Sequence, residues 1–181
     1  RQTLSKGKDL VSLESELQAV RAYVNLQKKR YVNRISVYYQ IDPLTLGAQI
    51  PKVTIQPLVE NSIRHGLTGD RSSISILIAS GIADDVIWIT VQDDGAGMDP
   101  DTLKQLVEGT VVSKEGNSLG FRNVDDRIKL YYGNRYGLQA RSQLGAGTTV
   151  TISLPCESAE LSPSEAELLE IKVEEKQDET K

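Results

Sequence analysis

The polar residues best suited to chemistry in this 181-residue chain fall in three short segments. The first segment spans residues 56–66, where Glu60 and Asn61 are adjacent in an otherwise apolar stretch. Asn61 and His65 are four residues apart, a spacing that places two side chains on one face of a helix. A polar face of this kind needs a partner, which is either a ligand or a group that Asn61 caps or bridges within the core.

The second segment, residues 93–98, reads Asp-Asp-Gly-Ala-Gly-Met and follows a predicted strand, where Gly95 and Gly97 allow a ligand to approach the backbone closely. The third, residues 116–123, is a loop of small residues that opens a helix, and its amides suit phosphate groups. Each segment alone is weak evidence, because Asp-Gly-Ala-Gly is a common turn. Their order, followed by Gly-Ala-Gly-Thr at residues 145–148, is much harder to obtain by chance.

Apolar periodicity predicts the elements that must position these segments. A period of two predicts strands, and helical spacing predicts helices. The predicted strands span residues 35–41, 74–80, 86–93, 138–143 and 148–154, with a hairpin at 81–85. The predicted helices span 51–67, 100–108 and 119–132, and Pro57 is expected to kink or break the first of them. We therefore expect an α/β fold, a two-layer sandwich of a mixed sheet of about five strands with about three helices on one face.

One long helix is expected to precede this sandwich. Its apolar positions alternate between spacings of three and four residues, which is the heptad pattern of a helix that packs against another helix. These positions are Leu10, Leu13, Leu17, Val20, Val24, Gln27 and Tyr31. The stripe is explained either by an amphipathic helix packed on its own domain or by the end of a coiled coil or bundle that dimerises.

The composition is that of an ordinary globular domain, with 39% hydrophobic and 25% charged residues. Cys156 is the single cysteine, which excludes a disulfide framework, and no apolar run approaches the roughly 20 residues that span a bilayer. Residues 157–181 hold nine acids and three lysines, and the rest of the chain is nearly neutral. We therefore expect no nucleic-acid binding and no direct membrane contact by this segment. The acidic tail, residues 156–181, is expected to be disordered apart from a weak helix near residues 166–173.

In this order the segments resemble the ATP-binding catalytic domain of sensor histidine kinases, in the GHKL family that also contains gyrase, mismatch-repair ATPases and anti-sigma serine kinases. Residues 56–66 resemble the N box of that family, residues 93–97 its Asp-x-Gly-x-Gly box, and residues 116–123 and 145–148 its later glycine boxes. The runs Gln-Pro-Leu-Val-Glu-Asn and Leu-Gly-Phe-Arg-Asn-Val are similar to the LytS/YesM-type branch. A helix pattern of that branch is matched by Leu13, Glu16, Leu17, Tyr23, Gln27 and Arg30.

The resemblance implies a Bergerat ATP-binding fold whose boxes assemble a nucleotide site. Asn61 would bind the magnesium ion that bridges the ATP phosphates, and Asp93 would accept a hydrogen bond from the adenine amino group. Gly97 would leave room for the base, and Thr148 would assist the adenine contact. The other implied cofactor-binding positions are Gly95, Leu119 and Gly120, the last two through amides that cradle phosphates.

Two further roles follow from the same resemblance. Residues 98–118 would form a lid over the nucleotide, although Ser118 stands where many relatives have glycine. Glu60 is the candidate general base that would take a proton from the acceptor imidazole.

The resemblance also divides the chain into three regions. Residues 1–33 would be the end of a dimerisation and histidine-phosphotransfer helix, residues 34–155 the ATP-binding catalytic domain, and residues 156–181 the tail. His65 is the single histidine and lies in the N box, so the ATP γ-phosphate is expected to go to a histidine on a dimerisation helix absent from this chain. The expected partners of the full kinase are a response regulator and a second copy of the kinase. The segment is expected to be cytoplasmic and its parent an integral cell-membrane sensor.

Other functions stay open at this point. Gyrase-like relatives that hydrolyse ATP place a glutamate four residues before the N-box asparagine, where this chain has Pro57. An interaction module that had lost nucleotide binding would not need Asn61, Asp93 and Gly97 together, and an anti-sigma serine kinase would lack the heptad helix. His65 could itself be the phosphoryl acceptor, but it shares a helical face with the expected metal ligand.

Overall fold

The computed structural model describes residues 9–67, 71–109 and 118–156. Its strands are β1 (Leu10–Ser12), β2 (Ile35–Ile41), β3 (Gln49–Pro51), β4 (Ile74–Ala83), β5 (Val86–Asp93), β6 (Gly137–Gln143) and β7 (Gly147–Pro155). Its helices are α1 (Leu13–Arg30), α2 (Gln56–Gly66), α3 (Pro100–Glu108) and α4 (Ser118–Tyr132), with a short 3₁₀ turn at Pro43–Thr45. No helix of the described residues is long and apolar enough to cross a membrane. The predicted tail from residue 157 onward and the lid residues 110–117 lie outside the described residues.

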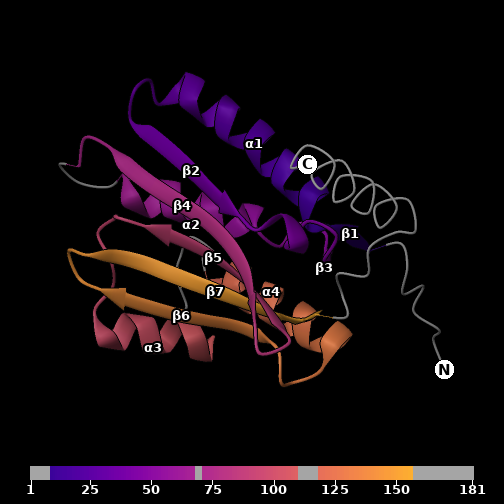
Figure 1. The fold of residues 1–181 in the computed structure, drawn as a ribbon. Helices are drawn as coiled ribbons and strands as arrows, with labels where there is room; N and C mark the ends of the chain where they lie inside the picture. Colours follow the sequence, from indigo (N-terminus) through magenta and orange to yellow (C-terminus); the bar gives the residue numbers. More distant parts are fainter. Residues whose placement is uncertain (1–8, 68–70, 110–117, 157–181) are drawn as a thin grey trace, which may run out of the picture.

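The main sheet has the strand order β2-β4-β5-β7-β6. β2 runs parallel to β4, and every other neighbouring pair is antiparallel. Figure 1 shows α1 along β2 at one edge of the sheet and α3 along β6 at the other edge. The expected mixed sheet of five strands, three helices and a preceding long helix is therefore confirmed. β1 and β3 form a separate two-stranded ribbon that the sequence analysis did not predict.

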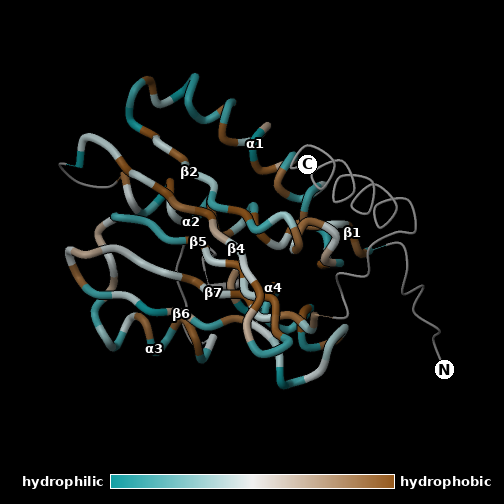
Figure 2. The backbone as a smooth tube through the Cα atoms, in the orientation of Figure 1, coloured by the Kyte–Doolittle hydropathy of each residue, from teal (hydrophilic) through white to brown (hydrophobic). Residues whose placement is uncertain are grey.

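One face of the sheet forms the core because the strands alternate apolar side chains with polar ones. Ile76, Ile89 and Ile152 are fully buried on this face, while Tyr38 and Arg141 are exposed on the opposite one. α2 contacts β4, β5 and β7, and α4 contacts β6 and β7, so the helices cover the buried face and complete the two-layer sandwich. In Figure 2, α1 and α3 alternate between hydrophilic and hydrophobic stretches, as expected of helices that pack one face against the domain.

The heptad stripe of α1 is buried in its own domain. Leu13, Leu17, Val20 and Val24 are at most 3% exposed, and α1 packs on α2 and β2. The first of the two interpretations, an amphipathic helix packed on its own domain, therefore describes this stripe. Leu10 lies in β1 instead of the helix, which begins after the cap Ser12. The assignment of residues 1–33 to the end of a dimerisation helix stays a prediction.

The prediction that a helix begins at Pro51 and kinks at Pro57 is wrong. Pro51 ends β3, where it pairs with Leu10 of β1, and α2 begins at Gln56. Pro57 falls in the first turn of α2, where the missing proline N–H has no helical partner in any case. The N box therefore lies on one unbroken helix.

The predicted hairpin at residues 81–85 is confirmed, with a tighter turn. Asp84 and Asp85 form the turn between β4 and β5, and both have positive φ, 51° and 59°. Two residues of positive φ match the right-handed twist of the strands that they join. Gly81 lies within β4 opposite Trp88, and a Cβ at this position would overlap the ring of Trp88.

Candidate nucleotide-binding site

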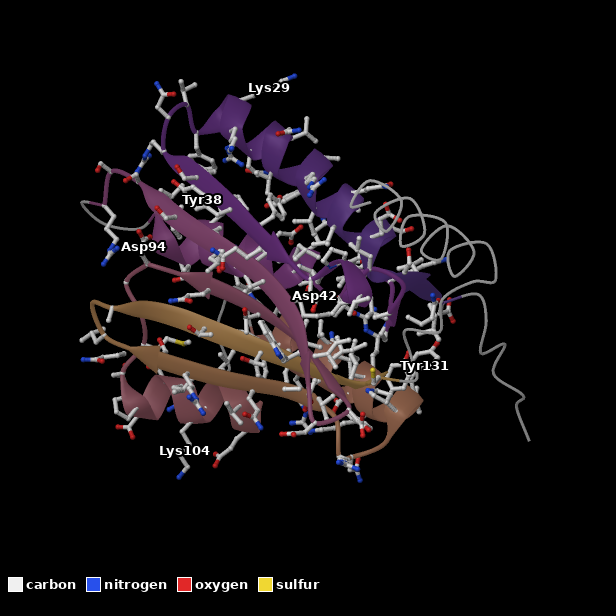
Figure 3. The ribbon with its side chains drawn as sticks, in the orientation of Figure 1. Lys29, Tyr38, Asp42, Asp94, Lys104 and Tyr131 are labelled. Atoms are coloured by element: carbon white, nitrogen blue, oxygen red, sulfur yellow. The ribbon has the colours of Figure 1, made fainter. Side chains whose placement is uncertain are left out.

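A cavity of about 460 Å³ opens between α2 and the ends of β5 and β7. Residues of the predicted boxes contribute to its lining, among them Asn61, His65, Asp93, Gly97 and Thr148. In Figure 3, Asp94 marks the end of the sheet at which β5 stops, and Tyr131 of α4 lies at the opposite end. The fold thus brings the N box, the Asp-x-Gly-x-Gly box and the last glycine turn to one site.

Asp93 is held at the floor of this cavity by three hydrogen bonds. Its Oδ1 accepts from the amides of Gly95 at 2.9 Å and of Thr148, its cross-strand partner, at 3.2 Å. Its Oδ2 accepts from the Ser62 hydroxyl at 2.8 Å. An ionised carboxylate has about four lone-pair sites, so a fixed Asp93 can accept one more hydrogen bond from a ligand amino group.

Gly97 and Gly147 join the loop after β5 to the turn between β6 and β7. Both have positive φ, +66° and +91°. A Cβ on Gly97 would overlap the carbonyl oxygen of Gln143, and a Cβ on Gly147 would overlap that of Asp93. The family resemblance implies that Gly97 makes room for the adenine base. In the structure, the nearby backbone of Gln143 by itself requires a glycine at this position.

Ser142 connects three residues on the Asp93 side of the cavity. Its hydroxyl accepts from the Met98 amide at 2.8 Å, donates to the Gly147 carbonyl at 2.9 Å, and lies 2.9 Å from Oγ1 of Thr148. Neither Ser142 nor Ser62 can be predicted from the sequence as a site residue, since serine in a strand or helix carries no signal of its own. The pairing register, which places Ser142 opposite Thr148, is the feature that identifies it.

Asn61 enters the cavity from α2, beside the start of α4. Its side-chain amide forms no hydrogen bond with the described residues and is therefore available to a ligand. A Cβ on Gly120 would lie 3.8 Å from Nδ2 of Asn61, which places this residue of the first turn of α4 next to the amide. The first N–H groups of a helix are unpaired and carry the positive end of its dipole. An amide oxygen can bind a cation and the N–H groups of a helix start can bind an anion, so their convergence here suits a phosphate group together with its metal ion.

Glu60 lies on a different side of α2. It is not among the residues that line the cavity, and Nε2 of Gln56 donates to its Oε1 at 2.8 Å. Burial first, and the negative charge of Glu60 second, raise the pKa of the Tyr23 hydroxyl on α1. Glu60 therefore lies toward α1, and its role as a general base stays a prediction.

The donor set of the cavity does not form a metal site by itself. Within the described residues, no three His, Cys, Asp or Glu side chains are grouped so that they could hold a metal ion. A cation beside Asn61 would therefore take most of its ligands from a bound ligand and water. Magnesium is commonly held in this way, by one or two protein oxygens and the phosphates of a nucleotide.

The fold and the cavity together define a two-layer nucleotide-binding domain, and comparison with known proteins agrees. Residues 49–158 match the family of histidine kinase-, DNA gyrase B- and HSP90-like ATPases. The match covers more than half of the chain, and the chain belongs to this ATPase family. The resemblance deduced from the boxes is thereby confirmed.

Two curated relatives are sensor proteins of the expected branch. The sensor histidine kinase YesM of Bacillus subtilis is 34% identical over 156 residues, 86% of this chain and 26% of the relative. The sensor protein LytS of Staphylococcus epidermidis is 35% identical over 149 residues, 82% of this chain and 25% of the relative. The chain thus spans about a quarter of the length of these curated relatives.

Solved structures share the fold. The catalytic domain of histidine kinase ThkA aligns with a TM-score of 0.62 at 14% identity, over 81% of this chain and 95% of that domain. The histidine kinase domain of the blue-light activated histidine kinase of Erythrobacter litoralis aligns with a TM-score of 0.59 at 20% identity. The alignment covers 82% of this chain and 63% of that domain. At these identities the likeness concerns the fold alone, and it confirms the expected sandwich.

Proposed function

We propose that this chain is the ATP-binding catalytic domain of a sensor histidine kinase, which transfers the γ-phosphate of ATP to a histidine outside the chain. The observation that carries the proposal is that Asp93 and Asn61 line one cavity from different elements, β5 and α2. Asp93 offers a fixed acceptor for the adenine amino group. Asn61 offers an amide oxygen to the metal ion that accompanies the phosphates, and the first turn of α4 offers N–H groups to the phosphates themselves.

Magnesium belongs to this proposal as the ion that accompanies ATP. Asn61 would hold it, and when bound the ion would neutralise charge on the phosphates. The residues of the chain then position the nucleotide: Asp93 fixes the base, Thr148 and Ser142 support Asp93, and the start of α4 orients the phosphates. Phosphoryl transfer depends mainly on such positioning and on electrostatic stabilisation.

Glu60 is the residue that we propose as general base. It directly precedes Asn61 in α2 and faces the α1 side of the helix. The acceptor imidazole would lose its proton to the Glu60 carboxylate as the phosphorus–nitrogen bond forms and ADP leaves. Glu60→Gln is expected to abolish transfer in the full kinase and to leave ATP affinity unchanged, which calorimetry on the same variant would check.

The full protein is proposed to act in a two-component pathway. The two curated relatives described above are a sensor histidine kinase and a sensor protein, which supports this proposal. Its partners would be a response regulator that receives the phosphoryl group and a second copy of the kinase joined through dimerisation helices. The domain would lie in the cytoplasm and its parent in the cell membrane.

Titration calorimetry of the chain with ATP and magnesium tests the proposed function. Asp93→Asn should weaken ATP on the order of tenfold or more, because the amide presents a donor where the adenine amino group needs an acceptor. Asp94→Asn is the matched control, since Asp94 lies outside the lining and its Oδ1 accepts from the Ser75 amide at 2.8 Å. Equal affinities for the two variants, or no binding by the unaltered chain, would contradict the proposal.

A further inference from the structure

The carboxylate of Glu16 on α1 is bound to the backbone that immediately precedes α2. Glu16 is only 4% exposed, and three amides donate to it. Thr54 and Ile55 donate to Oε1 at 2.7 and 3.0 Å, and Val53 donates to Oε2 at 3.1 Å. The residue at the helix start itself, Ile55, provides no side-chain cap. Glu16 therefore supplies the acceptor, and the negative charge, that the beginning of α2 lacks.

The same turn is held from its other side by α4. Nη1 and Nη2 of Arg127 donate to the carbonyl oxygens of Lys52 and Val53, each at 2.7 Å. Val53 has a φ of +58°, a conformation that a β-branched residue rarely adopts. Such a conformation persists only where the surroundings impose it. Glu16 and Arg127 together impose it, so this turn is clamped between α1 and α4.

The clamped turn and the nucleotide cavity are connected through one helix. Asn61 lies six residues after Ile55, about 9 Å along the axis of α2. The helix is rigid over this distance, so the placement of its first turn sets the placement of Asn61. The first turn of α4 ends beside the same amide, at Gly120.

We propose that Glu16 is a positioning residue through which α1 fixes Asn61 relative to the phosphates. The inference rests on the proposed function, because it assigns Asn61 to the metal and phosphate end of an ATP site. Coupling of this kind is reciprocal: a ligand that engages Asn61 must also strengthen the contacts of Glu16 with the turn. A movement of α1 that withdraws Glu16 releases the start of α2 and weakens that engagement.

Two nucleotide titrations of Glu16→Gln test the proposal. Glutamine has the same shape but is uncharged, and its Nε2 would face an amide that also donates. The affinity for ATP with magnesium should fall on the order of tenfold, the size of one lost charge-assisted hydrogen bond, while that for ADP in excess chelator should change less than about twofold. Glu14→Gln is the control, since Glu14 is an exposed acid in the same first turn of α1.

Hydrogen exchange of the unaltered chain provides a second test that does not depend on a variant. ATP with magnesium should slow exchange of the Thr54 and Ile55 amides more than ADP in chelator does. The Val86 amide in the distant β4–β5 hairpin should respond equally to both. If the two nucleotides protect the Thr54 amide equally, Glu16 is not coupled to Asn61 and the proposal is wrong.

The outcomes separate this proposal from the proposed function. An unaltered chain that binds no ATP overturns both. If the chain binds ATP and Glu16→Gln behaves as Glu14→Gln does, only the positioning role fails. Equal loss of both nucleotides in Glu16→Gln also overturns it, because general loosening of the domain would not distinguish the phosphate end from the adenine end. If Glu16→Gln does not fold, the exchange experiment decides.

Discussion

Ser62 on α2 donates a hydrogen bond to Oδ2 of Asp93 on β5 over 2.8 Å. Ser62 directly follows Asn61, so one helix carries both the amide that we propose for the phosphate end of the cavity and the hydroxyl that orients the carboxylate at its floor. α2 therefore contributes one side chain to each end of the proposed site.

Ser62→Ala should lower ATP affinity through this hydrogen bond. Ser62 is 7% exposed and its partner is charged, so the loss should correspond to about 1.5–3 kcal/mol, or at least tenfold in affinity. Ser36→Ala on the exposed face of β2 is the matched control. In a double-mutant cycle, Ser62→Ala should have little further effect on the Asp93→Asn protein. Full additivity of the two changes would show that Ser62 does not act through Asp93.

Gly97→Ala should destabilise the domain more than Gly145→Ala does. Both glycines have positive φ, +66° and +81°, so each alanine is strained by about 1–2 kcal/mol. Only at Gly97 would the added Cβ also overlap a carbonyl oxygen, that of Gln143, whereas Gly145 has nothing within 4 Å. Urea unfolding followed by Trp88 fluorescence measures the difference. Equal losses of stability in the two variants would mean that the loop that carries Gly97 moves aside without cost.

Much of this site follows from the sequence because its key residues lie at the ends of strongly periodic elements. Asp93 ends one predicted strand and Thr148 begins another, directly after the glycines of residues 145–147, so the pairing of these two strands is enough to bring Asp93 to Thr148. The position of Pro51 was mispredicted because a proline fits the end of an edge strand as well as the start of a helix. Local pattern does not distinguish the two cases.

The supporting residues could not be found in this way. Glu16 is one of two acids in the first turn of α1, and heptad spacing does not say which of them is buried. Its partners, the amides of residues 53–55, belong to a turn whose shape depends on Arg127, far along the chain. Such contacts are set by tertiary packing, which periodicity does not encode.

Asn61→Ala should remove the dependence of ATP binding on magnesium. The unaltered chain should bind ATP more weakly after chelation of the metal, because the phosphates then lose a ligand shared with Asn61. In Asn61→Ala, chelation should make little difference, while the contacts of Asp93 preserve a residual affinity. Calorimetry of both proteins, each with magnesium and with chelator, gives the four ATP affinities that the comparison needs. A magnesium effect of unchanged size in the variant would show that Asn61 does not hold the metal.

The stability that the Asp99 cap of α3 contributes should depend on pH. The hydroxyl of Thr102 first, and its amide second, hold the pKa of Asp99 below the ordinary value of 3.8. A carboxyl group whose pKa is lower in the folded than in the unfolded state stabilises the folded state at any pH above the unfolded pKa. This stabilisation is lost as the pH falls through the pKa of the folded state. Asp99→Asn should therefore differ from the unaltered chain in its urea midpoint above pH 3.8 and converge with it at lower pH. A difference in midpoint that persists unchanged at lower pH would show that the Asp99 carboxylate is not its cause.

The final prediction concerns the phosphoryl acceptor. Given ATP and magnesium, the isolated chain should form no acid-labile phosphohistidine, because its single histidine, His65, lines the same cavity and lies on the same helix as Asn61. A side chain beside the metal and phosphate ligands cannot approach the γ-phosphate in line with the leaving ADP. Turnover of ATP should also be slow, since Pro57 stands where hydrolysing relatives place a glutamate. Adding a dimerisation helix with an acceptor histidine should produce labelling of that helix. Labelling of His65, or rapid hydrolysis by the chain alone, would instead identify a self-sufficient kinase or ATPase.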